Sequence, residues 1–233
     1  MGVEVDVARA ARLIAEPARA AMLEALLSGV ALSAGELARA AGVSAATASE
    51  HLSRLVAGGL VEVHRTGRHR YHRLAAPEVA HALEALALIS PARPVSSLRR
   101  ARADTALRYV RSCYDHLAGR LGTALHDGLV ADGSLAVGGD GYLLTDAGQR
   151  RLVAVGVDVV AARAARRAFA RSCLDFTERR PHLAGALGAA LRQLCLDRGW
   201  LVRRAAGHRA LRLTDTGRRD LPAAFAIDLP PPD

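Results

Sequence analysis

The sequence predicts a mainly α-helical protein with small β-hairpins (α+β). Aromatic residues make up only 3% of the 233 residues while alanine is abundant, which favours helices packed through Leu, Val and Ala. Helix-capping signals and apolar spacing recur along the chain, interrupted by short alternating segments between glycines. Several blocks of the second half also occur twice in the same order, which predicts a repeated structural unit there.

The first predicted elements are two helices within residues 8–28, separated at Glu16–Pro17 because proline suits a first helical turn. Ser33 and Glu36 have the spacing of a capping box and open a short helix that ends at Gly42. A further helix begins after the N-cap Ser44, with an apolar face on one side, and ends at Gly58–Gly59.

Two alternating strands follow, residues 60–64 and 69–74, joined by a tight turn at Thr66–Gly67. Two short helices around a glycine turn and then a hairpin are the order of a winged helix-turn-helix. Pro77 opens another helix that runs to about Ile89. The proline-containing residues 91–98 predict a linker between a DNA-binding domain (1–90) and a C-terminal effector and dimerisation domain (99–228).

The second domain contains the repeat. Each copy is expected to read as two helices, a strand, a glycine turn, a second strand and a capped helix, so the domain is predicted to hold two degenerate winged-helix-like repeats. The Cys-x-Asp segments are expected to lie in helices, and the domain is expected to contain two small hairpins. The matched blocks are Arg111–Asp115 with Arg171–Asp175, Leu117–Leu125 with Leu183–Leu191, and Leu144–Gly148 with Leu213–Gly217.

The charge of the chain favours a polyanionic partner, with a formal net charge of +9 and a pI near 10.7. All 32 basic residues are arginines, which is typical of a GC-rich bacterial genome and predicts that part of this bias comes from codon usage. Residues 1–90 carry nine arginines and nine acids, and the excess lies entirely in residues 91–233. The DNA-binding surface must therefore be found from local pattern.

That pattern lies in the second helix of the motif and in the hairpin after it. The exposed N-terminal part of the helix is expected to enter the major groove, and the hairpin to contact phosphates or a minor groove, with part of the specificity coming from DNA shape. An ordinary solvated hairpin with scattered charge is the alternative. The DNA-binding candidates are Ser44, Ala45, Thr47, Ser49, Glu50, His51, Arg54, Arg65, Arg68, His69 and Arg70.

These blocks resemble the ArsR/SmtB family of bacterial repressors. The resemblance covers about a third of the chain and rests on Glu16–Arg19, Leu37–Ser44, Thr47–Leu52, Leu60–Val61 and Gly67–Tyr71. It implies a homodimeric repressor that binds a near-palindromic operator in double-stranded DNA and is released by an inducer. The chain start has no signal-peptide pattern and no apolar run approaches a membrane span, so a cytoplasmic protein without membrane contact is expected.

The inducer does not follow from the resemblance. The thiolate site of the family has no cysteine between Leu32 and Leu37, and His81 with Glu84 is either a surface pair or an incomplete zinc site. The repeated Cys-x-Asp blocks are the stronger candidates, with three readings: zinc or another divalent metal, a redox-switched disulfide, or buried structural residues. The residues are Cys113, Asp115, His116, Cys173, Asp175 and His182.

Two further interpretations complete the prediction. An organic inducer could bind an apolar pocket between the repeats near Tyr109, Phe176 and Trp200, while Cys195 is assigned to the core. Enzymatic activity is not expected, because the chain lacks a phosphate-binding glycine loop, a Gly-x-Ser-x-Gly segment and a His-Glu-x-x-His segment. The alternative function is a winged-helix protein-interaction module without specific DNA binding.

Overall fold

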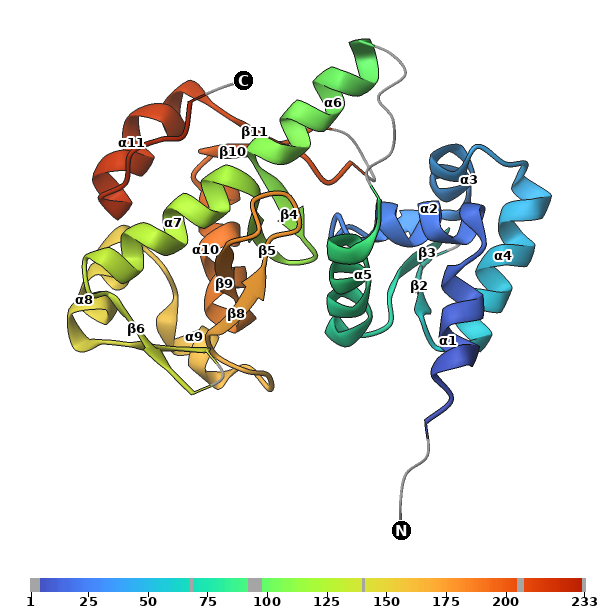
Figure 1. The fold of residues 1–233 in the computed structure, drawn as a ribbon, viewed down its shortest axis with the longest axis horizontal. Helices are drawn as coiled ribbons and strands as arrows, with labels where there is room; N and C mark the ends of the chain where they lie inside the picture. Colours follow the sequence, from blue (N-terminus) through green and yellow to red (C-terminus); the bar gives the residue numbers. More distant parts are fainter. Residues whose placement is uncertain (1–4, 68, 92–97, 140, 205–207, 232–233) are drawn as a thin grey trace. The chain divides into compact units, whose positions relative to one another are not determined.

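The computed structural model describes residues 5–67, 69–91, 98–139, 141–204 and 208–231 (Figure 1). About 53% of the chain is helical and 20% is in strands, which confirms a mainly helical protein with additional β-structure. The contacts divide the chain into two compact units, one up to Leu83 that also includes His208, and the other from Glu84 onward. Most of the predicted linker, residues 92–97, lies outside the described residues.

The first unit has the predicted order of elements. Glu16 caps the second helix by accepting the amides of Ala18 and Arg19, and Ser33 with Glu36 forms the expected capping box. Ser44 caps the next helix by accepting the amide of Thr47. The helices are α1 (Val7–Ile14), α2 (Pro17–Leu26), α3 (Ala34–Ala41), α4 (Ala45–Ala57) and α5 (Pro77–Ile89), the last of which reaches into the second unit.

A three-stranded antiparallel sheet completes the first unit, with the strand order β1-β3-β2. The wing is the hairpin of β2 (Val61–Thr66) and β3 (His69–Leu74). The short strand β1 (Leu32–Ser33) pairs with the edge of β3 that faces away from β2. Buried leucines of α2, α3 and α4 pack beneath it, including Leu23, Leu37 and Leu55. The sequence therefore predicted the winged helix-turn-helix correctly.

The second unit runs twice through one order of elements: helix, hairpin, helix, hairpin, helix. The first run is α6 (Leu98–Tyr109), β4 (Arg111–Cys113), β5 (His116–Ala118), α7 (Gly119–Ala131), β6 (Leu135–Gly138), β7 (Gly141–Leu144) and α8 (Asp146–Val155). The second run is α9 (Val159–Ala164), β8 (Arg171–Leu174), β9 (Pro181–Ala184), α10 (Gly185–Asp197), β10 (Leu201–Arg203), β11 (Leu211–Leu213) and α11 (Asp215–Phe225).

The two runs are interlaced rather than placed side by side. Hairpin β8-β9 extends the sheet of β6-β7 through the pair Gly141 and Arg171, and hairpin β4-β5 contacts the segment before β11 through the bridge between Arg111 and Ala210. The helices also contact the hairpin of the other run: α7 of the first run packs against β9 of the second, and α10 of the second run packs against β5 of the first. Each run therefore completes the other around one common core.

Two glycines at matching positions permit this close packing. Gly119 and Gly185 begin α7 and α10 with a φ of +80° each, which side chains larger than hydrogen adopt at a cost. A Cβ at Gly119 would lie 2.6 Å from the carbonyl oxygen of Arg108, and one at Gly185 would lie 2.7 Å from that of Ala168. Both helices can therefore begin directly against the preceding chain.

The expectation for the Cys-x-Asp segments was wrong. They form the hairpins β4-β5 and β8-β9 instead of helices, so the described part of the second unit contains four hairpins and not two. Ser, Cys, Tyr and Asp are all weak helix formers, and Tyr114 adopts a left-handed φ of 59° in the turn of the first hairpin. Pairing with distant strands then decides the conformation, which local spacing does not show.

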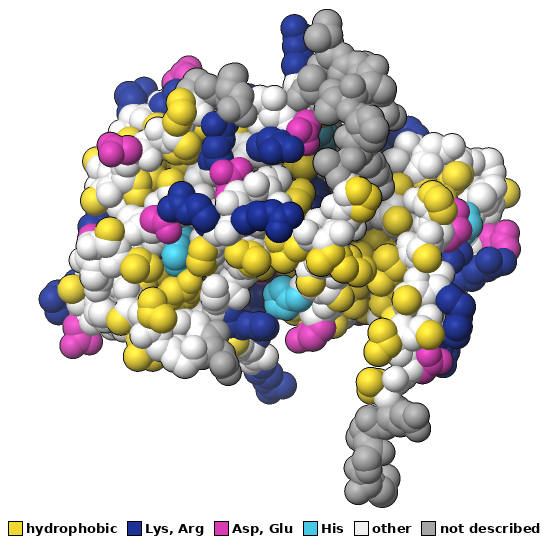
Figure 2. Space-filling view, viewed as in Figure 1, with side chains coloured by type: hydrophobic (Ala, Val, Ile, Leu, Met, Phe, Trp, Pro, Cys, Tyr) yellow, Lys and Arg dark blue, Asp and Glu magenta, His cyan; other side chains and the backbone are white. Residues whose placement is uncertain are grey.

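Within the described residues, no helix is long and apolar enough to cross a membrane. Figure 2 shows that basic side chains of the second unit are spread over the visible face and interspersed with acidic ones. The excess charge of residues 91–233 is therefore not gathered into one patch on this face.

Candidate DNA interface and buried Cys/His cluster

Helix α4 separates its side chains by function. Ala48, Leu52 and Leu55 are buried against the unit, whereas the candidates at the N-terminal end of the helix are exposed. The hydroxyl groups of Ser44 and Thr47 lie 2.8 Å apart at the start of the helix. The exposed candidates on and before α4 are Ser44, Ala45, Thr47, Ser49, Glu50 and Arg54.

Three further α4 candidates, Glu50, His51 and Arg54, form ion pairs within the chain. Arg54 lies 2.5 Å from the carboxylate of Glu50 on the same exposed face. His51 differs from the other candidates because its side chain is only 14% exposed, with Nδ1 3.6 Å from the carboxylate of Glu16. The structure therefore directs His51 toward α2 and leaves the other six candidates at the surface.

The wing carries its candidates at the exposed end of the hairpin. Arg65 lies directly opposite Arg70, and Thr66 lies opposite His69. Like charges at opposite positions of neighbouring strands repel each other, and an anion between them would relieve the repulsion. Nearer the base of the wing, Arg73 pairs with Glu62. The candidate Arg68 lies outside the described residues.

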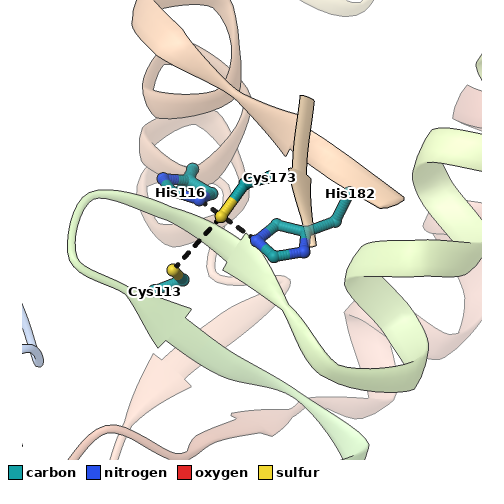
Figure 3. A group of neighbouring side chains, drawn as sticks. All are labelled: Cys113, His116, Cys173 and His182. Atoms are coloured by element: carbon teal, nitrogen blue, oxygen red, sulfur yellow. Dashed lines mark hydrogen bonds between the residues drawn. The ribbon is translucent and has the colours of Figure 1, made fainter. Parts of the chain in front are cut away.

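The second unit brings four candidate side chains together inside the protein (Figure 3). Cys113 and His116 come from the hairpin β4-β5, and Cys173 and His182 come from β8-β9. One potential ligand atom from each residue lies within 4.8 Å of all the others. The two sulfur atoms are 4.0 Å apart and the two Nε2 atoms are 3.1 Å apart, so these four residues could hold a metal ion.

Both aspartates stand beside this cluster and not within it. Asp115 lies 3.3 Å from Nδ1 of His116 and also pairs with Arg167. Asp175 lies 3.8 Å from Nδ1 of His182, which is beyond hydrogen-bonding distance. The cluster thus contains four of the six predicted effector residues, and the carboxylates contact its histidines from outside.

Asp175 is held by a buried ion pair, which agrees with the structural interpretation of the Cys-x-Asp blocks, although the sequence did not identify Arg111 as its partner. Its carboxylate accepts hydrogen bonds from the guanidinium of Arg111 at 2.8 Å and from the backbone amide of Gly119 at 2.6 Å. The side chains of Arg111 and Asp175 are both 0% exposed. Burial raises the pKa of Asp175, but the charge of Arg111 and the hydrogen bonds from Arg111, Gly119 and Thr177 together outweigh this and hold the pKa well below its usual range. The recurrence of Arg at 111 and 171 was the available signal.

The thiols of the second unit fall into two classes. Burial alone raises the pKa of Cys195 to about 12, which fits its assignment to the core. The pKa of Cys173 is lowered, because Cys113 and both imidazoles of the cluster donate hydrogen bonds that stabilise its thiolate. The pKa of Cys113 is raised because it keeps the shared proton and is buried. Of these two thiols, Cys173 is thus the one that ionises more readily.

Three other effector candidates, Trp200, Phe176 and Glu84, have ordinary structural partners, and Tyr109 lies under the guanidinium of Arg120, 5.4 Å from its ring centre. Trp200 is buried in the core, packs edge-on against Phe225 and donates to Asp220 at 3.1 Å. Phe176 lies under the guanidinium of Arg111, 4.2 Å from its ring centre. Glu84 is buried and paired with Arg209, so its carboxylate is already engaged.

Known proteins match the chain in two ways. A family model described as a helix-turn-helix domain matches residues 14–64. An uncharacterized HTH-type transcriptional regulator, YdfF of Bacillus subtilis (strain 168), is 39% identical over 213 residues, which are 91% of this chain and 94% of that protein. The similarity to YdfF therefore extends through the second unit.

Similar solved structures cover about two fifths of this chain. The winged helix-turn-helix domain of Mb0332 from Mycobacterium bovis, a possible ArsR-family regulator, is 30% identical, covering 38% of this chain and 89% of that chain with a TM-score of 0.34. The cadmium sensor CmtR from Mycobacterium tuberculosis is 35% identical, covering 40% and 100%, with a TM-score of 0.32. On its match to YdfF over nearly the whole length of both chains, this protein belongs to the HTH-type transcriptional regulators.

Proposed function

We propose that the protein is a homodimeric, non-enzymatic repressor that binds a near-palindromic operator through α4 and the wing. An effector acting on the second unit would release it from cytoplasmic DNA. The observation that carries the proposal is the surface of the first unit, where a helix with exposed polar residues at its N-terminal end precedes a hairpin tip bearing opposed arginines. The major groove admits such a helix, and phosphates attract such a tip.

The helix and the wing would have different tasks. Thr47 and Ser49 are exposed and short enough to hydrogen-bond base edges, and Ala45 offers a methyl group to thymine. Arg65 and Arg70 repel each other across the hairpin, and a phosphate group between them would replace repulsion with two charge-assisted contacts. The helix therefore supplies sequence preference, and the wing supplies salt-dependent affinity.

A near-palindromic operator, as proposed here, would require a homodimer. Two reading helices about one DNA turn apart require two copies of the first unit related by a two-fold axis. Helix α1 contributes no buried residue in the single chain, and Val7 on it is 71% exposed. A second copy could cover that apolar surface.

The second unit is proposed to be a duplication that serves as the effector domain. Its two runs share the order of elements, and its first hairpins share their register: Arg111 faces Ala118 as Arg171 faces Ala184. Each run could also be described as a degenerate winged helix. A protein-interaction module without specific DNA binding is the alternative function for such units.

Titration of the purified protein against the promoter DNA of its own gene tests the proposal. We expect a specific complex that weakens steeply with salt, a smaller salt dependence in the Arg65→Ala/Arg70→Ala variant, and relaxed sequence preference in Thr47→Ala, by about 1–3 kcal/mol. Arg212→Ala, at an exposed strand position of β11, is the matched control and should bind normally. An interaction module would show no salt-dependent preference for the promoter.

A further inference from the structure

We infer that Cys113, His116, Cys173 and His182 form a tetrahedral binding site for one Zn²⁺ ion per chain. Two thiolates and two imidazoles are a ligand set that zinc prefers, and four-coordinate zinc is almost always tetrahedral. The potential ligand atoms of all four residues lie within 4.8 Å of one another (Figure 3). Three of the residues are buried, and Cys173 is half-buried.

The backbone explains why the four side chains converge. In β4-β5 the residue opposite Cys113 is His116, and in β8-β9 the residue opposite Cys173 is His182. Directly opposite residues of an antiparallel pair project from the same face, so each hairpin presents one thiol and one imidazole together. The two hairpins contact each other through β5 and β9, which joins the two Cys/His pairs into one cluster.

The distances fit a single tetrahedral ion. Two sulfur ligands 2.3 Å from zinc should be separated by about 3.8 Å, and two imidazole nitrogens by about 3.3 Å. The structure places the sulfur atoms 4.0 Å apart and the Nε2 atoms 3.1 Å apart. The widest separation in the set, within 4.8 Å, requires the ligands to close by about 1 Å on an ion.

The protons and charges of the cluster also fit a cation. The two Nε2 atoms lie 3.1 Å apart, and a metal ion between them would take a lone pair from each. Nδ1 of His116 points at the carboxylate of Asp115, the partner that zinc-bound histidines usually have. Two thiolates and one divalent ion form a neutral centre, which suits a buried position.

The site has four protein ligands and no open position, so it belongs to the closed class of zinc sites and not to the catalytic class. An ion there would tie β4-β5 to β8-β9, whose ligands Cys113 and His182 are far apart in sequence. That the ion is the effector of the regulator rests on the function proposed above. The binding of zinc does not, because it is measured on the protein without DNA.

The test is uptake of Zn²⁺ and Co²⁺ by the full chain, purified under reducing conditions and stripped with a chelator. We expect about one zinc per chain and, with Co²⁺, the intense visible absorption of a tetrahedral site with thiolate ligands. Cys113→Ser and Cys173→Ser should abolish both signals. Cys195→Ala, which changes a core thiol outside the cluster, should keep them.

A second pair of variants separates loss of a ligand from loss of the fold. His182→Ala should lose the ion, whereas His182→Cys restores a zinc ligand and should retain it with an added thiolate contribution to the Co²⁺ spectrum. Wild-type protein that takes up no stoichiometric zinc, or that takes up as much as the Cys113→Ser/Cys173→Ser variant, would overturn the assignment. A metal-free protein with a Cys113–Cys173 disulfide would overturn it in favour of a redox switch.

Discussion

The two units hold their functional side chains in opposite ways. In the first unit, the described DNA-reading candidates come from one stretch of chain, and all of them except His51 are exposed. In the second unit, the cluster residues are largely buried and come from two hairpins about sixty residues apart. Substitution of an exposed DNA-reading candidate should therefore change binding without stability, and substitution of a cluster residue should change both.

The largest expected effect is loss of the buried ion pair in the second unit. Arg111→Ala would leave the buried carboxylate of Asp175 without its main partner, and breaking such a pair typically lowers the free energy of unfolding by about 3–5 kcal/mol. Urea denaturation followed by circular dichroism measures the change. Arg212→Ala is the control and should stay within about 0.5 kcal/mol of wild type. A loss below about 1 kcal/mol for Arg111→Ala would contradict the view that buried side chains of the second unit stabilise the fold.

Zinc should stabilise the second unit alone. An ion that binds only the folded state at a free concentration 100 times its Kd adds about 2.7 kcal/mol, so the melting temperature should rise with zinc concentration. Thermal unfolding of the chelated protein with added zinc measures this, with Cys195→Ala as a variant that responds and Cys173→Ser as one that does not. Equal responses in these two variants would place the bound zinc elsewhere in the chain.

A smaller effect is expected at a helix cap of the first unit. Ser33→Ala removes the hydroxyl that accepts the amide of Glu36, and the loss of an N-cap usually lowers the free energy of unfolding by about 1 kcal/mol. Ser53→Ala, at an exposed position within α4, is the matched control and should change it by less than about 0.5 kcal/mol. Equal losses in the two variants would mean that the capping box does not set the start of α3.

The first unit was predictable because its signals are local. Capping residues, the glycine turn and the alternating strands each act within a few residues, so helix α4 and the wing emerged with nearly correct bounds. The inward turn of His51 was not predicted, because it depends on the position of Glu16 in another helix. The local sequence pattern therefore predicts the helix, but it does not predict which residues of other elements contact its side chains.

The second unit was predictable in its residues but not in its geometry. The repeated blocks identified Cys113, Cys173 and the nearby histidines as a set, which the structure brings together. Their assignment to helices failed, because strand pairing with Gly141 and Ala210, distant in sequence, fixes these segments. The pairing of Arg111 with Asp175 crosses the two runs for the same reason and has no local signal.

The most direct test of the central claim joins the two units in one measurement. Fluorescence anisotropy gives the affinity of the full chain for its promoter DNA, with and without zinc, at fixed salt. If the ion is the effector, zinc should change the Kd of the wild type by 5–150-fold, a coupling of about 1–3 kcal/mol, and should leave Cys113→Ser/Cys173→Ser unchanged. Identical affinities for the wild type with and without bound zinc would contradict the claim that this centre controls DNA binding.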